Sequence, residues 1–252
     1  MRADQLLVER GIATSRSQAQ RLIASGLRWR VASGPWRTAA KNGDEIIDGA
    51  ELELADAAEA RYVSRGGLKL EAALRESAVS VEGRVCLDVG QSTGGFTDCL
   101  LRHGATGVVG VDVGHGQLHA SLAQDLRVRA FEGLNARALT TADLGDSAPA
   151  DGFGLIVGDL SFISMTLVLP ALSPMLAAGG DLLMLVKPQF ELQPGQVGKG
   201  GIVRDASLYA VVETRIRKAC ADAGLAVRHW LDSAIVGGDG NREFFIHAGR
   251  AR

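Results

Sequence analysis

From residue 85 onward, short apolar runs alternate with amphipathic segments of helical periodicity, and this alternation constrains the fold more than any other feature. Short runs that are apolar on both faces are typical of strands in a parallel sheet that helices cover on both sides. The pattern predicts an α/β domain with a doubly wound, Rossmann-like sheet. Its expected strands lie at 85–89, 107–112, 127–131, 155–159, 181–186, 226–231 and 244–248, and its expected helices at 68–78, 94–103, 165–177 and 207–223.

The first part of the chain has a different pattern, typical of a compact α+β module. Helices are expected at 2–9 and from Thr14 or Ser15 to residue 24, because a hydroxyl at either position can cap the second helix. Alternating polar and apolar residues predict strands at 27–31 and 45–54. We therefore expect a small domain over 1–58, a linker over 59–64 and the large domain over 65–252.

Charge is unevenly distributed, although the whole chain has a formal net charge of only −2. Residues 1–41 hold eight basic and two acidic side chains, whereas residues 42–60 hold seven acidic side chains and no basic one. A basic block on a nearly neutral protein indicates a local anionic partner such as a nucleic acid. A solvated helix face is the alternative interpretation of the same block.

Several function classes find little support in the composition. The three cysteines form no C-x-x-C pair, which favours reduced thiols and a cytoplasmic protein. The histidines show no convincing metal-ligand spacing, so we expect no metal site. The N-terminus does not resemble a secretory signal, and Pro170 and Pro174 interrupt the longest apolar stretch, so no membrane association is expected.

The first expected strand of the large domain runs into a glycine-rich turn, D-V-G-Q-S-T-G-G-F at 88–96. Gly90 permits a sharp turn, and an acid that ends the next strand, Asp112, is placed to accept hydrogen bonds from ribose hydroxyls. The turn lacks the G-x-G-x-x-G spacing of pyrophosphate sites, so a nucleoside cofactor without phosphates fits better, and S-adenosylmethionine is the common one. The alternative interpretation is that these glycines only form a tight strand–helix turn and bind no cofactor.

Asn135, after the third expected strand, could recognise adenine or could simply cap a loop. The candidate cofactor-binding residues are Asp88, Gly90, Ser92, Thr93, Gly94, Gly95, Phe96, Asp112, Asn135 and Asp159.

Charged residues at strand ends suggest a catalytic group. Lys187 closes an apolar strand, and a lysine there is costly unless it has partners or a task. Asp159 ends the neighbouring strand, Glu243 opens the last strand, and Lys69 precedes the sheet. Lys187 could act as a base toward a ribose hydroxyl, or it could remain a cation and stabilise the developing alkoxide. Ordinary ion pairs are the alternative for each residue taken singly.

The residues at 88–98, 111–118, 158–162, 187–191 and 238–241 together resemble the TlyA/hemolysin A family of bacterial ribosomal RNA 2′-O-methyltransferases over nearly the whole chain. The segments 2–11 and 15–19 also resemble the opening of an S4 RNA-binding domain, which this family carries. The resemblance implies an S-adenosylmethionine-dependent, FtsJ-like domain whose catalytic Lys-Asp-Lys-Glu set is Lys69, Asp159, Lys187 and Glu243.

The same resemblance implies cytidine 2′-O-methylation in ribosomal RNA, with ribosomal RNA or ribosomal subunits as partners. It makes Arg2, Arg16, Arg21 and Arg65 candidate RNA contacts. Two departures concern the expected V-N-G turn, which is V-A-S-G at 31–34, and Gln91, which replaces a usually small residue of the cofactor loop. The altered turn bears on how RNA docks, and Gln91 bears on the affinity for the cofactor.

Three other functions were weighed against methyl transfer. An RNA-binding or ribosome assembly factor with weak or no activity would not need the complete Lys-Asp-Lys-Glu set. A haemolysin-like membrane-active protein would need a spanning or barrel pattern that the sequence lacks. A nicotinamide-dependent oxidoreductase would be expected to carry G-x-G-x-x-G.

Overall fold

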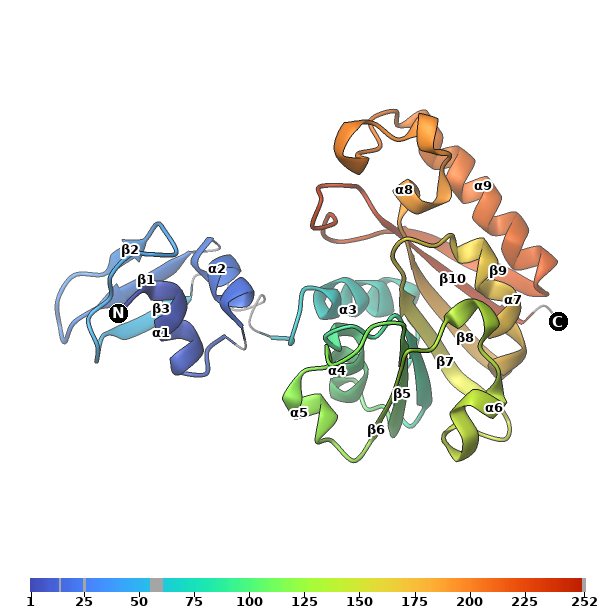
Figure 1. Ribbon diagram of the computed structural model, residues 1–252, viewed down its shortest axis with the longest axis horizontal. Helices are drawn as coiled ribbons and strands as arrows, with labels where there is room; N and C mark the ends of the chain where they lie inside the picture. Colours follow the sequence, from blue (N-terminus) through green and yellow to red (C-terminus); the bar gives the residue numbers. More distant parts are fainter. Residues whose placement is uncertain (14, 25, 55–60, 251–252) are drawn as a thin grey trace. The chain divides into compact units, whose positions relative to one another are not determined.

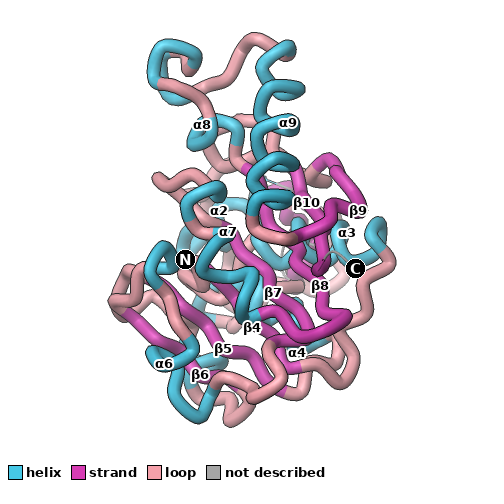
Figure 2. The backbone as a smooth tube through the Cα atoms, turned by 90° about the vertical axis from the view of Figure 1, so that its right-hand side faces the viewer, coloured by secondary structure: helices cyan, strands magenta, loops and turns pink. Residues whose placement is uncertain are grey.

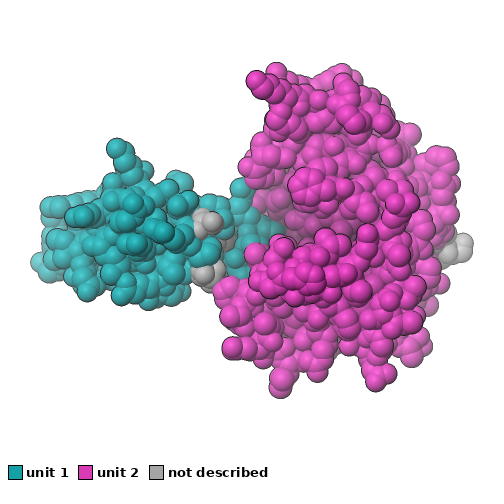
Figure 3. Space-filling model, in the orientation of Figure 1, with its two compact units in different colours: residues 1–68 teal, residues 69–252 magenta. Residues whose placement is uncertain are grey.

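The computed structural model describes residues 1–13, 15–24, 26–54 and 61–250 (Figure 1). The chain divides into two compact units, Met1–Leu68 and Lys69–Arg252 (Figure 3). This division falls a few residues beyond the linker expected at 59–64, of which residues 59 and 60 lie outside the described part of the chain. The domain limits 1–58, 59–64 and 65–252 remain predictions.

Unit 1 packs two helices against a three-stranded antiparallel sheet of order β2-β1-β3. Ser15 caps the second helix, since its hydroxyl oxygen accepts a hydrogen bond from the Gln18 backbone amide at 3.2 Å; Thr14, the other expected cap, lies outside the described residues. Leu6, Leu22 and Leu27 are fully buried in the core. The elements are α1 (Ala3–Glu9), α2 (Arg16–Ala24), β1 (Leu27–Arg30), β2 (Arg37–Ala39) and β3 (Glu51–Leu54).

The strand expected at 45–54 is wrong in its first half, since only Glu51–Leu54 belongs to the sheet. Glu45 forms one isolated bridge with Arg2, and a positive φ of 86° at Gly49 turns the chain before β3. The short strand β2 was not expected at all. Trp29 is buried in the core of unit 1.

Unit 2 contains a seven-stranded sheet of order β6-β5-β4-β7-β8-β10-β9, which confirms the predicted α/β class (Figures 1 and 2). The first five strands of this order are parallel, and β10 runs antiparallel to both β8 and β9. The strands are β4 (Val85–Val89), β5 (Gly107–Asp112), β6 (Val128–Glu132), β7 (Phe153–Asp159), β8 (Leu176–Val186), β9 (Leu225–Asp232) and β10 (Phe244–Arg250). The chain order reverses around β4, where doubly wound sheets bind their ligands.

Helices α3 and α4 lie on one side of this sheet, and α7 and α9 lie on the other (Figures 1 and 2). The helices are α3 (Gly66–Ser77), α4 (Gly95–Arg102), α5 (Ala120–Ala123), α6 (Thr141–Leu144), α7 (Leu169–Leu172), α8 (Pro188–Glu191) and α9 (Ser207–Asp222). The single helix expected at 165–177 is wrong. Pro170 and Pro174 remove backbone donors, so the segment breaks into short turns around α7, and β8 already begins at Leu176.

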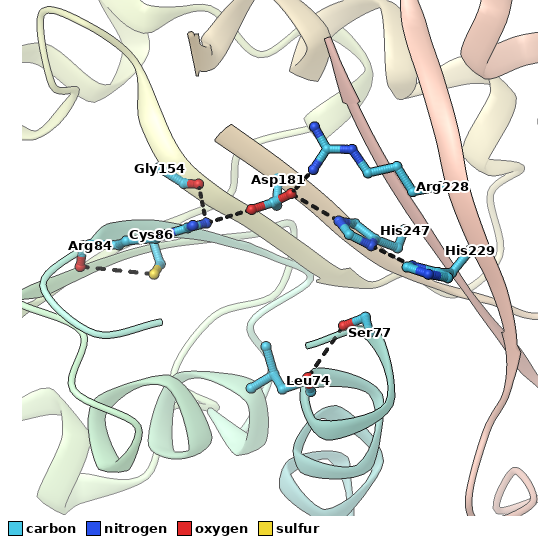
Figure 4. A network of polar contacts seen from close by, with 9 residues as sticks. All are labelled: Leu74, Ser77, Arg84, Cys86, Gly154, Asp181, Arg228, His229 and His247. Carbon is cyan, nitrogen blue, oxygen red and sulfur yellow. Dashed lines mark hydrogen bonds and ion pairs between the residues drawn. The ribbon is translucent and has the colours of Figure 1, made fainter. Parts of the chain in front are cut away.

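A buried carboxylate joins several strands of the sheet, six residues before Lys187 on β8 (Figure 4). Asp181 accepts hydrogen bonds from Arg84 at 2.8 Å, from His247 at 2.9 Å and from Arg228. His247 in turn faces His229, with 3.0 Å between their Nδ1 atoms. Burial alone would raise the pKa of Asp181, but the hydrogen bonds from His247 and Arg84 outweigh it and lower the pKa to about 2.

Asp181→Asn is therefore expected to destabilise the protein by about 2 kcal/mol at pH 7, because Arg84 and Arg228 lose their shared counter-ion. The pKa is lowered on folding, so the stabilisation exists above the ordinary aspartate range near pH 4 and disappears as pH falls through about 2. Urea unfolding at several pH values measures this. A variant as stable as the parent at pH 7 would contradict the account.

Candidate active site

A cleft of about 820 Å³ opens at the carboxyl ends of β4, β5 and β7. This volume is within the range of about 300–1,000 Å³ that is typical of small-molecule sites. Gly90 forms part of its wall with a positive φ of 83°, and a Cβ there would lie 2.6 Å from the Asp159 carbonyl oxygen. Only glycine therefore allows the chain leaving β4 to pass so close to the end of β7.

Asp112, at the end of β5, organises the loop beside the cleft. Its carboxylate accepts the Ser92 backbone amide at 2.8 Å and the Gly114 backbone amide at 2.7 Å. A carboxylate has about four acceptor positions, so capacity remains for ribose hydroxyls. Apolar Val111, Leu134 and Ile163 also line the cleft. This combination of a polar edge and apolar walls fits a nucleoside such as the one in S-adenosylmethionine.

Asn135 caps a turn at the edge of the cleft, and adenine recognition by it remains a prediction. Its side-chain oxygen accepts the Arg137 backbone amide at 3.0 Å and so caps the turn Ala136–Ala138, while the residue also lines the cleft. Five of the predicted cofactor-binding residues line this cleft: Gly90, Ser92, Asp112, Asn135 and Asp159.

The other predicted cofactor residues, Asp88, Thr93, Gly94, Gly95 and Phe96, are not brought to the cleft lining. Gly94 has a positive φ of 91° in the turn, and Gly95 begins α4. Phe96 is buried and stacks on Phe245, with ring centroids 6.1 Å apart. These residues shape the turn that carries the cleft wall, and a direct role in cofactor binding remains a prediction.

Asp88 lies fully buried beneath the loop, within a chain of hydrogen bonds. Thr97 Oγ1 donates to the Asp88 carboxylate at 2.7 Å, and Gln91 Nε2 donates to Thr97 Oγ1 at 2.9 Å. Burial raises the pKa of Asp88 to about 7, and the negative charges of Asp159 and Asp112 act in the same direction.

Gln91 therefore points into the protein rather than into the cleft. It packs against Gly110 of β5, where a Cβ would lie 2.0 Å from the glutamine amide. Gln91, which stands where the cofactor loop usually has a small residue, does not line the cleft.

The four charged residues of the predicted catalytic set form two ion pairs at this edge of the sheet. Lys187 Nζ lies 2.5 Å from Asp159 Oδ1, and Lys69 Nζ lies 2.5 Å from Glu243 Oε2. Phe244 of β10 pairs with Val186 of β8, so their neighbours Glu243 and Lys187 lie at the same sheet edge.

The two pairs share an electrostatic environment. Burial raises the pKa of Glu243; Lys69 and Lys187 act to lower it, and Asp159 adds to the increase. Of these four residues Asp159 alone lines the cleft, so the Lys187–Asp159 pair adjoins the proposed cofactor site. Their catalytic roles remain predictions.

Three further residues around Lys187 were not singled out from the sequence. Ser161 Oγ accepts a hydrogen bond from Lys187 Nζ at 2.8 Å. Phe162 is 91% exposed with a positive φ of 64°, and its ring lies 5.1 Å from that of Phe190. Buried Glu191 accepts hydrogen bonds from the 164–165 segment. Ser161 and Phe162 belong to the segment 158–162, and Glu191 belongs to the segment 187–191. Both segments carry the family resemblance, but the sequence alone assigned no role to these three residues.

In unit 1, Asp4 gathers two of the predicted RNA-binding arginines. It is buried and lies 3.0 Å from Arg2 and 3.6 Å from Arg16. The hydrogen bond from Arg2 is the main cause that lowers the pKa of Asp4. Arg21 lies on α2, and Arg65 directly precedes α3. An RNA-binding role for these four arginines remains a prediction.

Comparison with known proteins places this site in a family. The signature of FtsJ-like methyltransferases matches residues 62–250. The chain belongs to the FtsJ-like methyltransferase family. It is an S-adenosylmethionine-dependent methyltransferase, and the predicted resemblance to TlyA and hemolysin A is confirmed.

Relatives match this methyltransferase over nearly its whole length. Bacillus subtilis YqxC, named as a candidate rRNA methyltransferase, is 46% identical over 98% of this chain and 84% of its own. The 16S/23S rRNA (cytidine-2′-O)-methyltransferase TlyA of Mycobacterium tuberculosis is 43% identical over 97% and 88%. A Streptococcus thermophilus structure described as a candidate hemolysin superposes with a TM-score of 0.76 at 42% identity, covering 100% of this chain and 88% of that one.

None of the described helices of the methyltransferase is long and apolar enough to cross a membrane. Outside residues 14, 25, 55–60 and 251–252, no group of three or more His, Cys, Asp or Glu side chains is arranged to hold a metal ion.

Proposed function

We propose that this methyltransferase acts on the ribose 2′-hydroxyl of cytidine in ribosomal RNA. The observation that carries the proposal is the Lys187–Asp159 ion pair, which borders the cleft at the carboxyl end of the sheet. The TlyA relative is named for this reaction on 16S and 23S rRNA. Such a substrate would place the reaction in the cytoplasm, with ribosomal RNA or ribosomal subunits as partners.

The proposed chemistry requires the 2′-hydroxyl to pass its proton to solvent water as its oxygen bonds to the methyl carbon and the carbon–sulfur bond of the donor breaks. S-adenosylmethionine supplies, when bound, a methyl group on a positively charged sulfur. Gly90, Asp112 and Asn135 would hold it, because they line the cleft with close backbone approach and polar acceptors. Asp159 adjoins the cleft and orients Lys187 through their 2.5 Å ion pair.

Lys187 then acts on the substrate oxygen as a cation. Its nitrogen pairs with the Asp159 carboxylate at 2.5 Å, at the same edge of the sheet as Glu243. A fixed ammonium stabilises the negative charge that develops on the 2′-oxygen during transfer. The base role would instead require a neutral amine at this position. A ribosome assembly factor without activity would not require this arrangement beside a cleft.

Transfer of radiolabelled methyl groups to separated small and large ribosomal subunits tests the proposal. We expect incorporation into the RNA of at least one subunit, in proportion to enzyme and dependent on S-adenosylmethionine. Label found only in ribosomal protein, or none in either subunit from enzyme that binds the cofactor, would contradict it.

Arg16→Ala is expected to weaken binding to a ribosomal RNA fragment several-fold and to reduce the salt slope of binding by about 1, because one phosphate contact is lost. Arg16 lies on the outer face of α2, with a side chain that is 59% exposed. Affinity for S-adenosylmethionine should not change. Arg217→Ala is the matched control, since Arg217 is an exposed arginine of α9 that pairs with Glu213. Equal salt slopes for both variants would argue against RNA contact by Arg16.

A further inference from the structure

Two oxygen atoms hold the terminal nitrogen of Lys187. Asp159 Oδ1 lies 2.5 Å from Nζ, and Ser161 Oγ accepts a hydrogen bond from Nζ at 2.8 Å. Both oxygens come from the segment that leaves β7, and both residues line the cleft. Lys187 itself is largely enclosed, with a side chain that is 13% exposed.

The number of N–H groups on Lys187 Nζ limits how many partners the nitrogen can have. A lysine ammonium has three N–H groups around the Cε–Nζ bond. One of them is donated to Ser161 Oγ, while Asp159 Oδ1 contacts the same nitrogen as an ion pair. The side of Nζ away from these two oxygens remains for a substrate. Asp159 alone would leave Nζ free to rotate about one contact, whereas two contacts fix the rotation.

The loop that carries Ser161 is fastened to the segment that carries Lys187. Glu191, at the end of α8, accepts hydrogen bonds from the Ser164 hydroxyl at 2.5 Å and from the Met165 backbone amide at 2.7 Å. Helix α8 begins directly after Lys187. The contact between Ser161 and Lys187 is thus set by the protein itself and does not depend on bound substrate.

We propose that Ser161 is a positioning residue for methyl transfer, which orients Lys187 Nζ toward the substrate oxygen. The inference rests on the proposed function, because it assumes that Lys187 acts on the ribose 2′-hydroxyl. Ser161 acts through Lys187 and takes no proton from the substrate.

Ser161→Ala tests the proposal in the full-length protein, with rRNA methylation as the readout. We expect kcat to fall by about 10- to 100-fold, the effect of losing a hydrogen bond to a charged group. The KM for RNA and the Kd for S-adenosylmethionine should stay within about twofold of the parent, since Ser161 contributes orientation rather than affinity. Ser161→Thr keeps the hydroxyl and should restore most of the rate. Ser207→Ala is the control, because this exposed serine makes a hydrogen bond to one charged side chain, Asp205, and neither residue lines the cleft.

A double-mutant cycle with Lys187→Ala separates positioning through Lys187 from any other role. In single-turnover assays, Ser161→Ala should cost little further rate when Lys187 is already absent. The proposal is overturned if Ser161→Ala has parental kcat, if it weakens cofactor binding while kcat is retained, or if it costs the same factor with and without Lys187. Failure of the parent protein to methylate ribosomal RNA, or a fully active Lys187→Ala variant, would instead refute the proposed function.

Discussion

Lys187→Ala is expected to lower kcat for methyl transfer by about 10³-fold, while the Kd for S-adenosylmethionine stays within about twofold of the parent value. The expected loss is large because the substrate oxygen would have no cation beside it as its proton leaves. Cofactor binding should persist because Lys187 is not among the residues that line the cleft. Single-turnover methylation and calorimetric titration with the cofactor measure the two quantities.

Lys218→Ala is the matched control for this prediction. Lys218 also pairs with an aspartate, Asp222, at 2.7 Å, but it is an exposed residue of α9. The control should methylate at the parental rate. A parental methylation rate in Lys187→Ala would contradict the catalytic role assigned to Lys187. An equal loss of rate in both variants would indicate a general effect of removing a lysine.

Glu243→Ala is expected to lower both stability and activity, with a loss of about 3 kcal/mol in the free energy of unfolding. The reason is burial: Lys69 is 7% exposed and Glu243 is 3% exposed, so removal of the carboxylate leaves a buried ammonium without its counter-ion. Urea unfolding monitored by circular dichroism measures the free energy, and the transfer assay measures the rate.

A double variant separates the two effects of that substitution. Lys69→Met with Glu243→Leu replaces the buried pair by apolar side chains, which is often nearly neutral for stability. We expect its unfolding free energy to return to within about 1 kcal/mol of the parent, and its transfer rate to remain low. Full stability in Glu243→Ala alone would show that the pair is not buried as described. Recovery of activity in the double variant would show that the pair has only a structural role.

The two ion pairs therefore make different contributions. Asp159 of the Lys187 pair lines the cleft and has a 26% exposed side chain, so that pair can meet a substrate. The Lys69–Glu243 pair lies deeper and fixes the start of β10 against α3. Loss of Lys187 is therefore expected to act on the transfer rate, and loss of Glu243 on both stability and rate.

The sheet could be predicted closely because its strands are short apolar runs that the sequence isolates with glycines and polar residues. β4 and β5 begin and end at the predicted residues. The segment 165–177 was misjudged because its apolar residues are buried by tertiary packing, while Pro170 and Pro174 prevent one continuous helix.

The convergence of Asp159 and Lys187 followed from strand ends, since the carboxyl ends of parallel strands share one edge of a sheet. Glu243 reaches the same edge because β10, which it precedes, runs antiparallel to β8. Individual side-chain contacts could not be predicted from the order of the strands. The direction of Gln91 depends on the space left by Gly110 on the neighbouring strand. The bond between Ser161 and Lys187 depends on how the loop after β7 folds back, which local sequence does not determine.

The most direct test of the account identifies the chemical position of the transferred methyl group. Ribosomal RNA methylated by the purified protein would be digested to nucleosides and analysed by mass spectrometry against synthetic standards. We expect 2′-O-methylcytidine from the parent protein, and its loss in Lys187→Ala. Cytidine methylated on the base, with no ribose methylation, would contradict it.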